Sequence, residues 1–349
     1  MFQDTASSVM LERKFNLRGW ELSGEPDEGK PTNVLGLWWH KFEDTLAINV
    51  ESLTSMKCDV ITKKTLLSAA HRLYDPFGLV SSVALVPKLL VQETWRQNLG
   101  WTEEVDDDVK NRFLKWLKEI PLLGEVKIQR WIGVSGSATT ELHVFADACK
   151  TSYATVIFLR VKTEQSVQLH LLASKARVAP TSKSKIGMTI PRLELLAASI
   201  AARLYTTVVQ DYKLKGVKTV FWTDATTVLA WLLRNSPWDV FVHNRVSEVR
   251  DLTVGCEWRH VPGEQNPADL PSRGCAAKKF VKSKWWEGPN WLKEDPENWP
   301  QSDVSFDESE INMELKKSVV SAMVSTVQTV DTSYYQYFSS YPKLIRMIA

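Results

Sequence analysis

The stretch Glu141-Leu-His-Val-Phe-Ala-Asp147 decides the fold, because its β-forming residues predict a strand that ends on a carboxylate. Two more strands are predicted at residues 152–161 and 167–175, and their short connections favour antiparallel pairing. This part of the chain therefore predicts a three-stranded antiparallel sheet with an acidic residue at one edge.

A long helix and two further strands extend this pattern. Pro191 suits the first turn of a helix, and apolar residues from Leu193 to Leu204 recur at a helical spacing. The remaining predicted elements are a strand at 218–224, helices at 228–234 and 240–251, and a strand at 255–261. The order βββαβααβ predicts an α/β fold, in which a mixed five-stranded sheet has helices on its faces.

Smaller units are expected on either side of this sheet. Short strands and turns come first, followed by a helical segment. A Trp-rich, charged spacer and a helical tail follow the sheet. The expected units are residues 1–60, 61–137, 138–276 and 277–349.

The composition excludes several classes of protein. The chain has 349 residues, 44% of them hydrophobic, and a net charge of +2, so it is globular and not histone-like. Its four cysteines form no C-x-x-C pair, which favours a reducing compartment over a zinc site. The N-terminus lacks the apolar region of a signal peptide, and residues 79–91 are too short and too polar to span a membrane. We therefore expect an intracellular protein that is not secreted and has no membrane partner.

Four carboxylates stand where chemistry is expected. Asp147 and Asp224 end two predicted strands, Glu194 lies in the first turn of the long helix, and Asp269 follows the last strand. Each alone is more often a turn former or a helix cap. Together they repel one another unless divalent cations bind between them, and oxygen ligands without Cys or His favour Mg²⁺ or Mn²⁺ over zinc.

Several motifs around these carboxylates together resemble one family. The motifs are Phe145-Ala-Asp147-Ala, Ile190-Pro-Arg-Leu-Glu194-Leu, Phe221-Trp-Thr-Asp224 and Asn266-Pro-Ala-Asp269-Leu-Pro-Ser-Arg-Gly274. They resemble the ribonuclease H region of Bel/Pao-type LTR retrotransposon Pol polyproteins. Upstream, Phe15-Asn-Leu-Arg-Gly-Trp20 resembles the end of that family's reverse transcriptase palm. Downstream, Trp285-Trp-Glu-Gly-Pro-Asn-Trp-Leu292 resembles the spacer before its integrase.

The resemblance implies a fold and an activity. The fold is a ribonuclease H-like sheet preceded by a small α+β and helical reverse-transcriptase remnant. The activity is two-metal-ion cleavage of RNA in RNA–DNA hybrids, with Asp147, Glu194, Asp224 and Asp269 holding two Mg²⁺ or Mn²⁺ ions. No Tyr-x-Asp-Asp motif occurs, so we expect no polymerase activity.

The resemblance also implies partners and a location. The partners are the RNA–DNA hybrid and the missing reverse transcriptase and integrase portions of the polyprotein. The expected location is a cytoplasmic particle or the nucleus. Cys149 and Ala225 stand where the family has serine, but neither position is a metal ligand.

Basic residues are expected to bind the nucleic acid. From Glu141 to Cys275 the chain has 17 Lys and Arg against 12 Asp and Glu, a balance that suits a phosphate backbone. The candidate contacts are Lys175, Arg177, Lys183, Lys185 and Arg245. An ordinary solvated loop explains the lysines equally well, and Arg245 can instead be structural. His260 is a candidate auxiliary residue, with a simple strand-end histidine as the alternative.

Three alternative functions stay open at this point. The same fold could be a non-catalytic remnant that at most binds nucleic acid. An aspartic peptidase needs an Asp-Thr/Ser-Gly turn, whereas Asp147-Ala-Cys and Asp224-Ala-Thr have no such glycine. A transposase-type nuclease would have its glutamate last, whereas Glu194 here precedes Asp224.

Overall fold

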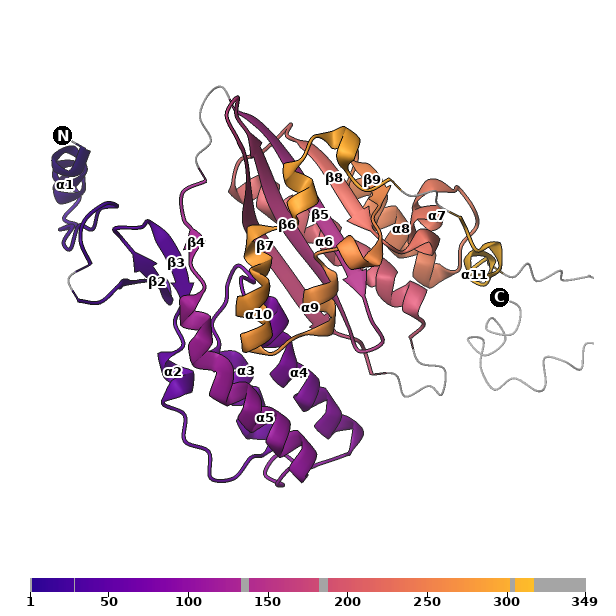
Figure 1. The fold of residues 1–349 in the computed structure, drawn as a ribbon, viewed down its shortest axis with the longest axis horizontal. Helices are drawn as coiled ribbons and strands as arrows, with labels where there is room; N and C mark the ends of the chain where they lie inside the picture. Colours follow the sequence, from indigo (N-terminus) through magenta and orange to yellow (C-terminus); the bar gives the residue numbers. More distant parts are fainter. Residues whose placement is uncertain (1, 28, 133–137, 182–187, 302–304, 317–349) are drawn as a thin grey trace, which may run out of the picture. The chain divides into compact units, whose positions relative to one another are not determined.

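The computed structural model describes residues 2–27, 29–132, 138–181, 188–301 and 305–316. Its centre is a five-stranded sheet in the order β7-β6-β5-β8-β9 (Figure 1). The strands are β5 (Thr139–Ala148), β6 (Ser152–Lys162), β7 (Val167–Val178), β8 (Lys218–Thr223) and β9 (Glu257–His260). β5, β6 and β7 pair antiparallel, whereas β8 pairs parallel to both β5 and β9. The predicted α/β fold with a mixed five-stranded sheet is therefore confirmed.

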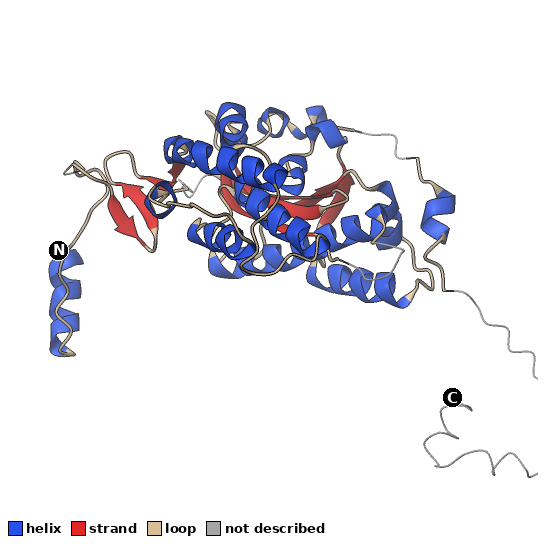
Figure 2. Ribbon diagram, turned by 90° about the horizontal axis from the view of Figure 1, so that it is seen from below, coloured by secondary structure: helices blue, strands red, loops and turns tan. Residues whose placement is uncertain are grey.

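Helices cover both faces of the sheet (Figure 2). One face packs on α6 (Ile190–Asp211), which in turn packs against α7 (Thr226–Leu233) and α8 (Val240–Leu252). The other face carries α9 (Asp269–Arg273) and α10 (Ala277–Ser283). Because both faces are covered, β5 and β6 are buried along almost their whole length. β6 is largely an apolar run, whereas β5 buries the polar side chains of Glu141, His143 and Asp147 among apolar ones.

Tryptophans from beyond residue 276 complete this second face. The Trp291 ring lies 5.9 Å from that of Phe145, and the Trp285 ring 6.2 Å from that of Phe158. The Trp299 ring is 5.9 Å from that of Trp222. Trp285 and Trp291 stand on the short 3₁₀ turns η3 (Trp285–Glu287) and η4 (Asn290–Lys293), and Trp299 directly follows η5 (Pro296–Asn298). The segment expected to be a spacer therefore belongs to the hydrophobic core of the sheet.

The residues before the sheet form a second, smaller sheet and a group of helices. Helix α1 (Phe2–Glu12) comes first, and the small antiparallel sheet has the order β1-β2-β3-β4. Its strands are β1 (Thr32–Val34), β2 (Leu37–His40), β3 (Thr45–Ile48) and β4 (Ile128–Gln129). The helices between β3 and β4 are α2 (Glu51–Thr54), α3 (Lys63–Arg72), α4 (Ser81–Arg96), α5 (Asp107–Glu119) and η1 (Ile120–Glu125). Helix α4 packs against β7 and α9, so the helical segment and the large sheet share one core.

A tight loop between α3 and α4 closes the outer edge of β7. The Ser174 backbone N–H donates to the Phe77 carbonyl at 2.8 Å. Gly78 has φ +75°, and a Cβ at this position would stand 1.8 Å from the Ser174 carbonyl oxygen, so only glycine fits. Asp75 accepts from the Leu79 and Val80 backbone N–H groups at 2.7 and 2.9 Å, which fixes the start of α4. The loop thus covers part of an edge strand that would otherwise be exposed.

Two short elements follow the large sheet, η2 (Gly263–Gln265) and α11 (Glu308–Asn312). Among the helices that the structure describes, none is long and apolar enough to cross a membrane.

Candidate metal centre

Strand pairing brings two of the predicted carboxylates side by side. Ala146 on β5 is the register partner of Thr223 on the parallel strand β8. Asp147 and Asp224 each follow directly, so both stand at the same edge of the sheet. Asp147 and Asp224 therefore lie on adjacent strands, as a shared metal site requires.

Helix α6 supplies the third carboxylate. The helix begins at Ile190, and its N-cap residue Thr189 accepts from the Arg192 backbone N–H. Glu194 is the fifth residue of α6, slightly further into the helix than predicted. Carboxylate oxygens of Asp147, Glu194 and Asp224 lie within 4.8 Å of one another.

Burial and mutual repulsion perturb all three acids. Asp147 is 3% exposed and Glu194 is 8% exposed. Burial, helped by the Asp224 charge, raises the pKa of Asp147 from its ordinary value of 3.8 to about 7. Burial and the charges of Asp147 and Asp224 raise the pKa of Glu194 well above its ordinary value. Burial also raises the pKa of Asp224. Without a cation, this edge of the sheet therefore favours protonated carboxyl groups.

Residues of the segment after β9 hold two of the carboxylates in place. The Ser272 hydroxyl donates a hydrogen bond to Asp147. The Asn266 side-chain amide donates to Asp224 at 3.3 Å and to the Ala146 carbonyl at 3.0 Å. Both residues lie in the Asn266–Gly274 motif, but sequence reasoning assigned them no role. The sequence pattern that could have identified them is a polar residue three positions before Asp269 and another three positions after it, neither with an expected hydrogen-bond partner.

The arrangement fits a hard divalent cation. One oxygen of the Glu194 carboxylate is buried and has no hydrogen-bond partner among the described residues. An unpaired buried oxygen is costly, and a metal ion would satisfy it. The other residues that line this open cleft of about 670 Å³ include Cys149, Lys150, Thr151 and Arg273. The donors that converge are carboxylate oxygens, the ligands that Mg²⁺ prefers.

The fourth predicted acid lies outside this group. Asp269 begins α9, and its carboxylate accepts a hydrogen bond from the Arg273 guanidinium one turn later. It is nevertheless close enough for its charge to raise the pKa values of Asp147 and Asp224. The structure therefore brings three of the four predicted carboxylates together and places the fourth at their periphery.

His260 ends β9 beside the centre. Its register partner is Thr223, and the His260 charge lowers the pKa of Asp224. The His260 Nδ1 atom is buried without a hydrogen-bond partner in the described part of the chain. The candidate auxiliary residue is thus adjacent to Asp224, on the side away from β5.

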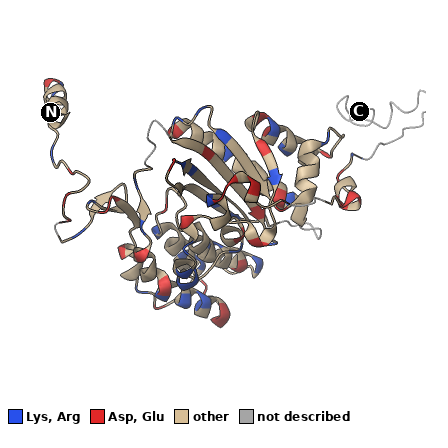
Figure 3. Ribbon diagram, turned by 45° about the horizontal axis from the view of Figure 1, so that its top comes forward, with Lys and Arg blue, Asp and Glu red and all other residues tan. Residues whose placement is uncertain are grey.

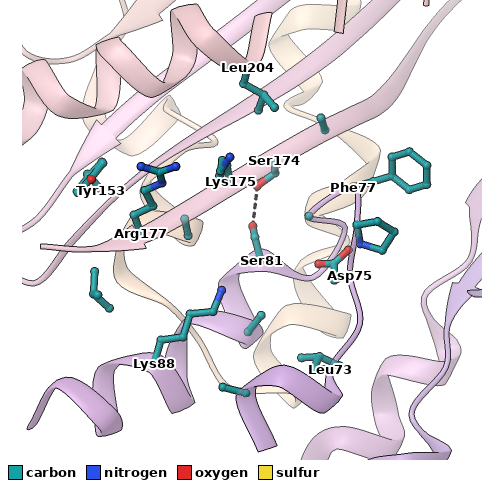
Figure 4. Close-up of a pocket in the computed structure, with 17 residues that line it drawn as sticks. Leu73, Asp75, Phe77, Ser81, Lys88, Tyr153, Ser174, Lys175, Arg177 and Leu204 are labelled. Carbon is teal, nitrogen blue, oxygen red and sulfur yellow. Dashed lines mark hydrogen bonds between the residues drawn. The ribbon is translucent and has the colours of Figure 1, made fainter. Parts of the chain in front are cut away.

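The predicted basic contacts are divided between two places. Lys175 and Arg177 stand on β7 and line a pocket of about 580 Å³ between that strand and α4 (Figure 4). Lys88 on α4 lines the same pocket, although sequence reasoning gave it no role. Asp75 is the one carboxylate that lines this pocket, and its oxygens already accept from the backbone of α4. The pocket is therefore electropositive.

Arg245 is held differently. It stands on α8, where its guanidinium donates to the Phe241 carbonyl at 3.0 Å and lies 3.7 Å from the centroid of the Phe241 ring. These contacts favour a structural role. Lys183 and Lys185 lie outside the described residues.

Comparisons with known proteins agree with this fold. Residues 62–225 match the family model described as the Pao retrotransposon-like RNaseH-like domain. No curated protein matches the chain.

Several solved structures are similar at low identity. Ribonuclease H1 of the archaeon Halobacterium salinarum has 17% sequence identity, over 37% of this chain and 90% of that one, with a TM-score of 0.25. LC11 ribonuclease H1, isolated from compost by a metagenomic approach and solved with an RNA/DNA hybrid, has 13% identity over 41% and 99%, with a TM-score of 0.28.

The foamy viral protease-reverse transcriptase, solved with double-stranded DNA, has 10% identity over 67% of this chain and 44% of that one, with a TM-score of 0.41. This chain thus spans less than half of the foamy viral protein. Because all three TM-scores are below 0.5, the ribonuclease H-like assignment rests on the family match and on the strand order.

Proposed function

Because residues 62–225 match the Pao retrotransposon-like RNaseH-like domain, we propose that this chain is an endonuclease that cleaves the RNA strand of RNA–DNA hybrids within a retrotransposon Pol polyprotein. The observation that carries the proposal is the convergence of Asp147, Glu194 and Asp224 within 4.8 Å. Two buried carboxylates and one half-buried carboxylate, none with an ion pair to lysine or arginine among the described residues, suit divalent cations better than they suit any metal-free acid–base pair.

The proposed cofactor is a pair of Mg²⁺ or Mn²⁺ ions. When bound, such ions supply Lewis-acid activation of water and charge stabilisation for phosphodiester hydrolysis. In this chain, Asp147, Glu194 and Asp224 would provide the oxygen ligands, with Asp269 available at the periphery. Ser272 and Asn266 orient the carboxylates of Asp147 and Asp224 through hydrogen bonds.

The proposed substrate contacts lie on the same edge of the sheet. β7 runs in the same direction as β5, because both pair antiparallel with β6. Arg177 is the partner of Tyr153, which is the partner of Ala148, so Arg177 stands two strands away from the metal centre, about 10 Å across the sheet. Lys175, Arg177 and Lys88 would bind backbone phosphates. Selection of a hybrid would depend on groove shape and the 2′-hydroxyl rather than on base sequence.

The wider context is also a proposal. The remaining reverse transcriptase and integrase portions of a polyprotein would be the protein partners, and the location would be a cytoplasmic particle or the nucleus. The division of the chain at residues 60, 137 and 276 stays a prediction.

The test compares cleavage of a labelled RNA–DNA hybrid by the full chain and by Asp224→Asn, with Mg²⁺ present. We expect product from the wild type and a loss of at least about 100-fold in the variant, since a ligand oxygen becomes an amide. Equal product from both, or none from either, would refute the nuclease proposal and favour the non-catalytic alternative. Cleavage of a peptide that is blocked by an aspartic-protease inhibitor would favour the peptidase instead.

A further inference from the structure

An acidic segment near the C-terminal end of the described chain lies against α7 and α8. Residues Asp307 to Leu315 contain four acidic residues and no basic one (Figure 3). Ile311 anchors the segment, because it is fully buried in the core formed with α7 and α8. Two backbone contacts fix its path. The Trp231 indole donates to the Ile311 carbonyl at 3.3 Å, and the Asp239 N–H donates to the Glu314 carbonyl at 2.7 Å. We refer to residues 307–315 as the acidic strap.

Three carboxylates of the acidic strap accept hydrogen bonds from side chains on α6 and on or next to α7. Glu314 accepts two hydrogen bonds from Arg192, at 2.6 and 2.7 Å. Glu308 accepts two from Arg234, also at 2.6 and 2.7 Å. Glu310 accepts one from the Thr227 hydroxyl. A carboxylate held by both arms of a guanidinium has the geometry in which arginine also binds phosphate.

Two of these contacts are made by residues that are near the candidate metal ligands in sequence. Arg192 is in the first turn of α6, two residues before Glu194. Thr227 is in the first turn of α7, three residues after Asp224. The starts of both helices carry partial positive charge and favour anions. The Glu314 and Glu310 carboxylates therefore lie at the starts of α6 and α7, whereas Glu308 binds Arg234, directly after the last residue of α7.

We propose that Arg192, Arg234 and Thr227 form a phosphate-binding surface for nucleic acid, and that the acidic strap occupies it as an internal competitor. The ligand is the phosphodiester backbone, and its identity rests on the proposed function. The two ion pairs differ in exposure: the Glu308 side chain is 58% exposed and Arg234 34%, whereas the Glu314 side chain is 11% exposed and Arg192 31%. Salt and competing phosphates therefore weaken the Glu308–Arg234 pair first, and release of Glu314 follows.

The test measures the binding of a mixed-sequence RNA–DNA hybrid to the full chain, without divalent cations so that no cleavage occurs. The variant is Glu308→Gln/Glu310→Gln/Glu314→Gln. We expect about tenfold tighter binding at low salt. We also expect the dependence of log affinity on log salt to steepen by about one to two, because Arg234 loses its carboxylate partner and Arg192 keeps only Asp239, at 3.5 Å.

A matched control separates this effect from net charge. Glu12→Gln/Glu125→Gln/Glu164→Gln makes the same change of charge at exposed positions that form no ion pair in the described chain. We expect this control to change affinity less than the strap variant and to leave the salt dependence unaltered. Adding Arg192→Gln and Arg234→Gln to the strap variant should abolish its gain.

A second variant guards against a fold defect in the first. Ile311→Ser loosens the anchor while keeping every charge, and should also tighten hybrid binding. Thermal unfolding of each variant reports whether the core remains intact. The proposal is overturned if the strap variants bind no more tightly than the control, or if the gain persists without the two arginines. If the chain cleaves hybrids but the strap variants bind no more tightly, only the competitor role of the strap is refuted. If the strap variants bind more tightly but the chain does not cleave hybrids, only the nuclease proposal is refuted.

Discussion

Phe145 and Trp222 stack across β5 and β8 with ring centroids 6.1 Å apart and planes 11° from parallel, and each stands two residues before a carboxylate of the candidate centre. Because the two rings are register partners, their contact and the meeting of Asp147 with Asp224 have the same origin in the strand pairing. The aromatic core thus fixes the spacing of the acidic edge.

Removing one of these rings should destabilise the protein strongly. Trp222→Ala empties a fully buried site, so we expect a decrease of about 3–5 kcal/mol in the free energy of unfolding. Urea denaturation monitored by circular dichroism measures it. Trp131→Ala is the matched control, since Trp131 is 68% exposed and should change stability by less than about 1 kcal/mol. Equal losses from the two variants would contradict the packing described above.

The raised pKa of Asp147 predicts an unusual dependence of stability on pH. In the unfolded chain this carboxyl ionises near its ordinary value of 3.8, but in the folded chain near 7. Between these values the folded state binds more protons, so stability falls as pH rises from about 4 to about 7. Urea unfolding without divalent cations should show this fall, on the order of a few kcal/mol.

Two comparisons identify the carboxyl group as the cause. Asp147→Asn should reduce the decline between pH 4 and pH 7, because the amide does not ionise, while Glu194 and Asp224, whose pKa values are also raised, keep part of it. Mg²⁺ should restore the stability of the wild type at pH 8 and have little effect on the variant. An identical pH profile in the wild type and the variant would show that other groups cause the decline.

Ser272 should act through Asp147 without binding substrate. Ser272→Ala removes the hydrogen bond that orients the carboxylate, and we expect an increase of about 10–100-fold in the Mg²⁺ concentration for half-maximal cleavage. Hybrid affinity without divalent cations should not change. Ser283→Ala is the control, because its hydroxyl donates only to the Phe280 carbonyl. A loss of cleavage that excess Mg²⁺ does not restore would contradict the positioning role.

The electropositive pocket between α4 and β7 predicts a measurable salt effect. Lys88→Gln should weaken hybrid binding at low salt and reduce the slope of log affinity against log salt by about 0.9, the value for one phosphate contact. Lys115→Gln, at an exposed position on α5, should leave the slope unchanged. Unaltered slopes for both variants would mean that the nucleic acid does not reach this pocket.

Much of the fold follows from local patterns in the sequence. β6 is largely an apolar run because it is covered on both faces, and α6 has an apolar stripe with Pro191 in its first turn. The three converging carboxylates could be predicted because strand ends and the start of a long helix are recognisable positions. These features depend on neighbours that are close in sequence or on the order of the strands.

The remaining features depend on contacts that no local pattern encodes. The 3₁₀ turns that carry Trp285 and Trp291 have no periodicity, so the sequence does not show which surface these rings cover. Lys88 meets Lys175 across a pocket between two segments far apart in the chain. Asp269 was expected among the ligands from its position after the last strand and from the motif, and its ion pair with Arg273, one helical turn later, was not predicted.

The tryptophans beyond residue 276 restrict where a protease could cut this chain without exposing its core. A cut at residue 276 would expose Phe145, Phe158 and Trp222 to water, since Trp285, Trp291 and Trp299 now cover them. Such a product would present a large apolar patch and would be prone to aggregate. A soluble fragment that holds the large sheet must therefore keep the chain through Trp299.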